Sequence, residues 1–206
     1  MNITLRIILL FIILTTFSKN LYSYTLYYVG EVESRVYNDA WSQFFDKKIK
    51  VYAGASKEDA TIGLSFDMSL TEFTVAYRFD YVNDKDLAKN NFFNDLIYSL
   101  NKGIEWSQIA KDNSAETQKK IKVDLCNMTL EWEGVYCEAT FFSANQGNQT
   151  DFILLVKEDG EYSFNEDKFY IDFNNQKKLQ DILLNQVKDK LLYSLDQQEK
   201  SADLFN

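Results

Sequence analysis

The chain of 206 residues contains no proline, no histidine and only seven glycines. Without histidine, it cannot form a Ser-His-Asp triad, a histidine-activated cysteine or the common zinc sites with histidine ligands. General acid–base chemistry would fall to aspartate, glutamate, lysine or tyrosine side chains. The sequence also lacks a glycine-rich phosphate-binding loop. We therefore predict no catalytic, cofactor-binding or metal-binding residues, and the sequence favours a non-enzymatic role.

Long apolar runs are also missing, apart from one at the N-terminus. Arg6 is followed by an apolar run over residues 7–14, and residues 21–23 end in a small serine. This order of positive charge, apolar core and small residue is typical of a secretory signal peptide. The run is shorter than the ~20 apolar residues of a membrane-spanning helix. We predict a signal peptide over residues 1–23 with cleavage after Ser23, and an uncleaved N-terminal anchor is the alternative.

Positive charge is scarce in this sequence. The chain has 22 lysines and arginines against 31 aspartates and glutamates, which gives a net charge of −9. Removal of residues 1–23 takes away Arg6 and Lys19 and moves the net charge from −9 to −11. This charge argues against binding to nucleic acid or to anionic lipids, because both need a basic surface. At 46% apolar residues, the chain can still bury a core. We predict a single soluble domain over residues 24–206, secreted or periplasmic, without a transmembrane segment.

Two strictly alternating segments give the clearest structural signal. Residues 62–68 and 73–81 alternate apolar and polar side chains, and a short polar link joins them, which predicts a β-hairpin. Apolar residues at helical spacing predict two amphipathic helices. The first covers residues 88–111, with Gly103 as a candidate kink, and the stripe of the second runs over residues 179–195.

Shorter signals complete the expected order of elements. The remaining predicted strands cover residues 25–32, 49–53, 121–125, 130–142, 151–156 and 169–173, and a short helix is predicted over residues 38–45. Asn174 or Asn175 is the expected N-cap of the last helix. Short turns between neighbouring strands require antiparallel pairing. The sequence therefore predicts an α+β domain, in which two amphipathic helices pack on one face of an antiparallel β-sheet.

Cys126 and Cys137 are the two cysteines of the chain. An even number of cysteines in an exported protein favours a disulfide. If the strands around them pair, the bridge requires the connection between the strands to fall near residues 127–131. The alternative interpretation is a pair of free thiols in the core or in a reducing compartment.

Two groups of acidic residues suggest a chemical role. Glu131 and Glu133 flank Trp132, and a strand would place both carboxylates on one face, as a glycosidase requires. A solvated strand face opposite a buried tryptophan fits the same pattern. Residues 80–86 collect several oxygen ligands but lack the spacing of a calcium loop, and a helix cap explains them. Neither group is predicted to be a site.

The functional hypothesis is therefore a non-enzymatic one. We expect an exported protein that binds another protein or a component of the cell envelope. The alternatives are a carboxylate-dependent hydrolase and a small-ligand carrier with an aromatic-lined pocket. A deep pocket with convergent polar groups would favour the alternatives, whereas a filled core with an exposed apolar patch would favour partner binding.

Overall fold

The computed structural model describes residues 25–57, 59–67, 72–80, 87, 89–130, 133–160 and 164–203. Its eight strands form one antiparallel sheet with the order β4-β3-β2-β1-β8-β7-β6-β5. The strands are β1 (Tyr27–Asn38), β2 (Gln43–Ala55), β3 (Asp59–Asp67), β4 (Glu72–Asp80), β5 (Thr117–Leu130), β6 (Glu133–Ala144), β7 (Gln149–Gly160) and β8 (Phe164–Asp172). The helical elements are α3 (Asn91–Asp112), α4 (Phe173–Asp181), the π-helical turn η2 (Ile182–Gln186) and α5 (Val187–Asp203). The predicted signal peptide lies outside the described residues.

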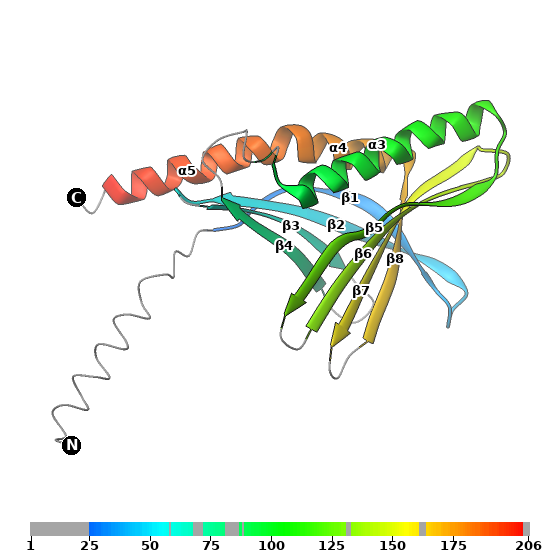
Figure 1. Cartoon of the computed structure of the whole chain (residues 1–206), viewed down its shortest axis with the longest axis horizontal. Coiled ribbons are helices and arrows are strands. Elements are labelled where there is room, and N and C mark those ends of the chain that lie inside the picture. Colours follow the sequence, from blue (N-terminus) through cyan, green and yellow to red (C-terminus); the bar gives the residue numbers. More distant parts are fainter. Residues whose placement is uncertain are drawn as a thin grey trace, which may run out of the picture.

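The sheet consists of two four-stranded halves, β1–β4 and β5–β8, which meet along a short seam. The seam is the pairing of β1 with β8, and its register covers Arg35 with Tyr170 and Val36 with Phe169. The elements α4, η2 and α5 follow one another without a gap, and we call them together the C-terminal helix. Before the seam, this helix lies along β1, where the Glu33 amide donates to Asn175 Oδ1 of α4 at 3.2 Å. The two halves therefore diverge, and Figure 1 shows β5–β8 turning away from β1–β4 below the helices.

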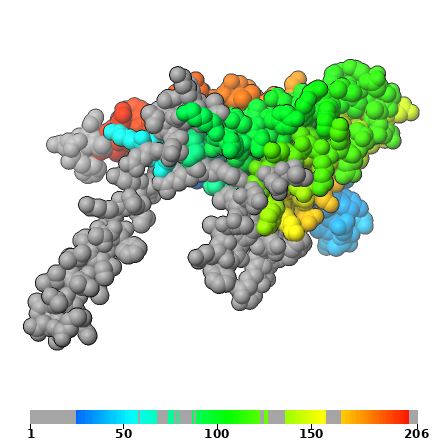
Figure 2. All heavy atoms as spheres, viewed as in Figure 1, coloured from blue at the N-terminus to red at the C-terminus, as the bar shows by residue number. Residues whose placement is uncertain are grey.

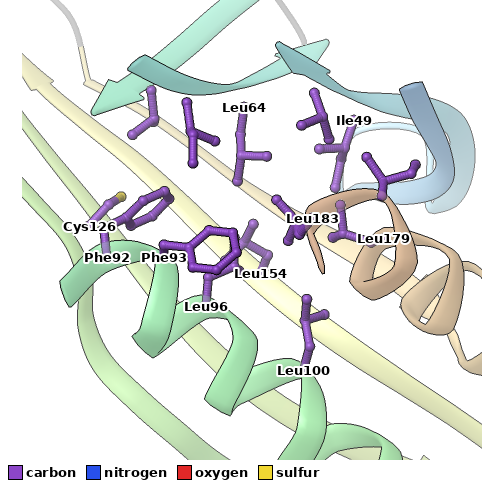
Figure 3. Close-up of a cluster of buried hydrophobic side chains, with 14 of the residues drawn as sticks. Ile49, Leu64, Phe92, Phe93, Leu96, Leu100, Cys126, Leu154, Leu179 and Leu183 are labelled. Atoms are coloured by element: carbon purple, nitrogen blue, oxygen red, sulfur yellow. The ribbon is translucent and has the colours of Figure 1, made fainter. Parts of the chain in front are cut away.

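The helices close the fold on one side of the sheet (Figure 1), as the sequence predicted. Figure 3 shows side chains of α3 and of the C-terminal helix pointing toward one another and toward strands of both halves. Burial of each large apolar side chain contributes about 1.5–3 kcal/mol to folding. The helical part of this core comprises Phe92, Phe93, Leu96, Leu100, Leu179, Ile182, Leu183, Val187 and Leu191, and its strand part includes Ile49, Leu64, Phe66, Leu154 and Phe169.

The two helix caps differ from the sequence prediction. The N-cap of α4 is Asp172, not Asn174 or Asn175, because its Oδ1 accepts from both of their amides at 2.9 Å. Asp172 is the last residue of β8, so the chain passes from strand to helix without a linker. Asn90 caps α3 by accepting from the Phe93 amide at 2.9 Å. Both caps satisfy amides that the first turn of a helix leaves unpaired.

Gly103 does not kink α3, which runs without a break from Asn91 to Asp112. Its role is to allow close approach of α4. The Gln176 side chain is fully buried and donates to the Leu100 carbonyl at 2.9 Å. A Cβ atom at Gly103 would lie 2.0 Å from Gln176 Nε2. Glycine at this position therefore lets the two helices cross, which explains why the helical pattern tolerates it.

The short helix predicted over residues 38–45 is wrong. This segment is the end of the β1–β2 hairpin, in which Asn38 pairs with Gln43. Asn38 Oδ1 accepts from the Trp41 amide at 3.2 Å, and the Ser42 amide donates to the Asp39 carbonyl at 3.3 Å. Asparagine, aspartate and serine favour such local bonds over helical ones. The turn therefore reverses the chain over four residues.

Candidate functional site

The acidic residues that suggested chemistry in the sequence fall mostly outside the described residues. Glu131, Trp132 and residues 81–86 are among these. Glu133 begins β6 and Asp80 ends β4, but their side chains are not described. In the part of the chain that the structure describes, no group of three or more cysteine, aspartate or glutamate side chains is placed to hold a metal ion. No helix among the described residues is long and apolar enough to span a membrane.

Cys126 and Cys137 lie directly opposite each other on β5 and β6, at disulfide distance. Their Cα atoms are 4.8 Å apart, which is close to the ~4.5 Å of a non-hydrogen-bonded cross-strand pair. The register pairs Leu130 with Glu133, so the connection between the strands consists of residues 131 and 132. Both cysteines are buried in the core, and Figure 3 shows Cys126 beside Phe92. The pair is therefore a structural feature of the β5–β6 hairpin.

Four depressions on the described surface are open, with volumes of about 180–320 Å³. One of them, of about 260 Å³, contains a buried carboxylate, that of Asp151. Its oxygens already accept from Arg35 at 3.0 Å and from Gln149 at 3.3 Å. This depression therefore presents no unsatisfied buried charge to a ligand.

The outstanding surface feature is the end of the β1–β2 hairpin, residues 37–46, which we call the hairpin tip. Residues 39–46 are all exposed. Figure 2 shows this region as the blue lobe that projects from the body beside the yellow and orange strands. The projection follows from the short seam, because β1 continues beyond its last pair with β8 and carries β2 along with it.

Four aromatic side chains are exposed on the hairpin tip. Their exposed fractions are 72% for Trp41, 45% for Phe44, 41% for Tyr37 and 39% for Phe45. They account for four of the eleven large apolar or aromatic side chains that are exposed in the described part of the chain. Single exposed apolar residues are ordinary on protein surfaces, but a cluster within so few residues is not. The hairpin tip is therefore the best candidate interaction surface among the described residues.

The base of the hairpin tip is held rigidly against the second half of the sheet. The Phe44 ring makes edge-to-face contacts with Tyr37 at 5.1 Å and with Tyr170 of β8 at 5.2 Å between centroids. The Arg35 guanidinium lies over the Phe44 ring at 5.2 Å and also pairs with Asp151 of β7. Burial, with the nearby carboxylates of Asp151 and Asp39, raises the pKa of Tyr170, so this phenol stays neutral at physiological pH. These contacts hold Tyr37 and Phe44, which pair with each other on one face of the hairpin, in place before any partner arrives.

Charges around the hairpin tip are distributed unevenly. Each of the three described cations near it has an acidic partner: Arg35 pairs with Asp151, Lys47 with Asp67, and Lys48 with Glu31. The acids of the tip itself, Asp39 and Asp46, are exposed and form no ion pair with the described residues. The surface is therefore aromatic and locally negative.

The sequence pattern does not indicate this surface, because it predicts a helix over residues 38–45. A usable signal was present, since turn-forming residues at positions 38, 39 and 42 gather between Tyr37 and Phe44. Compared with known proteins, the chain matches no family model, and neither a curated protein nor a solved structure is similar to it. The functional argument therefore rests on the geometry described above.

Proposed function

We propose that this protein is an exported, non-enzymatic binding protein that engages its partner through the hairpin tip. The observation that carries the proposal is the cluster of four exposed aromatic side chains on a projecting, rigidly based hairpin. Aromatic residues are enriched in the centres of protein interfaces, and a preformed surface loses little entropy on binding. Export is supported by the signal-peptide pattern of residues 1–23.

The alternative functions have less support. A small-ligand carrier needs a concave pocket that encloses most of its ligand, whereas the depressions described above are open. A carboxylate-dependent hydrolase would depend on Glu131 and Glu133, for which the support is the sequence pattern alone. Binding through the hairpin tip draws on an observed surface, and we therefore prefer it.

The test is capture of partners from the native compartment with three versions of residues 24–206. These are the wild-type protein, the tip variant Trp41→Ser/Phe44→Ser, and the control variant Tyr98→Ser/Ile109→Ser. Tyr98 and Ile109 are 50% and 49% exposed on α3, so the control removes a comparable apolar surface elsewhere. We expect the same partner to be retained by the wild-type protein and the control and lost by the tip variant.

Equal capture by the tip variant and the wild-type protein would contradict the proposal. Phe44 also packs on Tyr170, so the thermal midpoint of each variant is measured first. The single variant Trp41→Ser serves as a second test, because no ring contact of Trp41 with other described residues supports the fold. Hydrolysis of a glycoside that is abolished in Glu131→Gln and unchanged in the tip variant would favour the enzymatic alternative.

The export part of the proposal has its own test. N-terminal sequencing of protein recovered from the periplasm or the medium should begin at Tyr24. A membrane-bound product that retains Met1 would indicate an uncleaved anchor, and a product confined to the cytoplasm would contradict export altogether.

A further inference from the structure

The charge pattern of the hairpin tip carries information about the partner, provided that the tip is the binding surface, as proposed above. Asp39 lies in the turn, and Asp46 lies on β2 opposite Arg35. The Arg35 guanidinium does not neutralise Asp46, because it is engaged with Asp151 at 3.0 Å. Two exposed carboxylates thus flank the aromatic cluster without a cation from the described part of the chain to balance them.

The protein already shows which group fits such a surface. Arg35 places its guanidinium over the Phe44 ring at 5.2 Å while it pairs with a carboxylate. Trp41 and Asp39 belong to the same four-residue turn, and no cation of the described residues lies over the Trp41 ring. Aromatic faces attract cations, with arginine the more frequent cation and tryptophan the best ring. A guanidinium or ammonium from outside would meet a complementary surface there.

From this arrangement we infer that the partner of the hairpin tip is a protein segment rich in arginine or lysine. Its cationic side chains stack on the aromatic rings and pair with Asp39 and Asp46. The net charge of −9 favours approach of a basic partner over long distances and opposes approach to an anionic membrane. A flat aromatic surface without the two carboxylates would carry no such preference.

The experiment measures binding of a fluorescent peptide with arginine at every third position to residues 24–206 by fluorescence anisotropy. The matched peptide with glutamate in place of arginine controls for non-specific adhesion. The variant Asp39→Asn/Asp46→Asn removes both charges and keeps the side-chain shapes. The control variant Asp189→Asn/Glu199→Gln removes the same charge from exposed positions of α5. Salt titration and vesicles of phosphatidylcholine complete the set.

We expect the arginine peptide to bind saturably and the glutamate peptide not to bind. Asp39→Asn/Asp46→Asn should weaken binding about tenfold, because each exposed contact of this kind contributes a few-fold. The control variant should change binding less than about twofold, and added salt should weaken the wild-type complex. Failure of the arginine peptide to bind, or equal effects of the two double variants, would overturn the inference.

Two further outcomes separate this inference from the proposed function. If a captured partner depends on Trp41 and Phe44 but is retained by Asp39→Asn/Asp46→Asn, the inference fails and the binding role of the tip stands. If phosphatidylcholine vesicles bind in a manner that Trp41→Ser abolishes, the tip faces a membrane, and the inference is wrong.

Discussion

Two turns of this protein have similar backbone conformations but different surroundings. The β1–β2 turn and the β6–β7 turn each connect two strands through four residues, 39–42 and 145–148. Both contain non-glycine residues in the left-handed region, Ser42 at φ 50° and Asn145 and Gln146 at φ 53° and 56°. Left-handed residues match the twist of paired strands. The two turns differ in what surrounds them.

The β6–β7 turn is built into the body of the protein. The Gln146 amide donates to Glu116 Oε1 at 2.9 Å, and Gly147 is buried against the end of α3. A Cβ atom at Gly147 would lie 2.1 Å from the Ala110 carbonyl oxygen. This turn therefore serves packing, and its sequence is restricted by the helix above it.

The β1–β2 turn has no such neighbour among the described residues and carries exposed aromatic side chains instead. Leaving rings such as Trp41 and Phe44 in water forfeits burial that the fold elsewhere exploits. Asn38 and Ser42 make the turn with local bonds, so residues 39–42 hold their shape without packing against another element. Because the two turns have similar geometry, that geometry does not explain why aromatic side chains are exposed at the tip. Their exposure therefore supports a binding role.

The largest expected difference in stability between the two turns is at Gly147. Gly147→Ala should lower the free energy of unfolding by about 3–5 kcal/mol, since a side chain there combines left-handed strain with overpacking. Its φ of 76° is in the region that favours glycine. Trp41→Ala in the other turn should change stability by less than about 0.5 kcal/mol, as exposed positions usually do. Chemical denaturation of both variants measures the difference, and similar losses would show that the tip is part of the packed body.

A second test asks whether the C-terminal helix is packed on the body of the protein or is a detachable binding arm. If this helix were a detachable binding arm, replacing a leucine in it would not destabilise the body. Leu183 is fully buried, whereas its neighbour Leu184 is 46% exposed. Leu183→Ala should therefore cost about 2–5 kcal/mol. Leu184→Ala should leave the unfolding midpoint nearly unchanged, and equal midpoints for the two variants would identify the helix as the arm.

A third hairpin, β5–β6, differs from the first two because a disulfide can support it. A bridge between Cys126 and Cys137 closes a short loop and should stabilise the protein by about 3 kcal/mol on the chain-entropy model. Intact-mass measurement of protein from its native compartment should reveal two thiols only after reduction. Reductant should lower the unfolding midpoint of the wild-type protein but not that of Cys126→Ala/Cys137→Ala. Free thiols before reduction would leave the β5–β6 hairpin supported by packing alone.

Sequence patterns predicted the packed part of the fold well and the projecting part badly. Strict alternation located β3 and β4, although β3 is buried on both faces: every residue from Asp59 to Phe66 is buried, the polar ones included. Tyr37, Trp41, Phe44 and Phe45 instead fall at i, i+4, i+7 and i+8, which is the spacing of a helical stripe. That stripe signals burial against a core, and the hairpin tip has no core beneath it among the described residues. The exposed aromatic residues of the tip thus have the spacing of a different element.

Among the residues considered as candidate sites, only the cysteine pair could be placed from the sequence, because a bond between two side chains restricts how their strands pair. The requirement that two cysteines meet limits the possible registers of β5 and β6. Cys126 and Cys137 do pair, and the connection, residues 131 and 132, lies at the edge of the expected range of 127–131. The junction of Arg35, Asp151 and Tyr170 joins segments more than one hundred residues apart. No local sequence pattern predicts contacts of this kind, because they depend on how the two halves of the sheet pack against each other.

The smallest effect concerns the ion pairs at the base of the β1–β2 hairpin. The hydrogen bond from Lys48 is the main cause that lowers the pKa of Glu31. A lowered folded-state pKa means that Glu31 stabilises the protein above its unfolded-state pKa and loses this contribution as the pH falls through the folded-state value. Lys48 is exposed and Glu31 is partly exposed, so solvent screening keeps the contribution small.

The variant Glu31→Gln should therefore unfold slightly below the wild-type protein at neutral pH, and the two midpoints should converge in acid, once Glu31 is protonated. Thermal midpoints measured across the acidic range provide the comparison, with Glu199→Gln as a control that removes an exposed charge on α5. A large loss of stability in Glu31→Gln at neutral pH would mean that ion pairs, rather than the ring contacts of Phe44, hold the base of the tip. The preformed binding surface would then depend on pH and salt, which the observed packing of Phe44 on Tyr170 argues against.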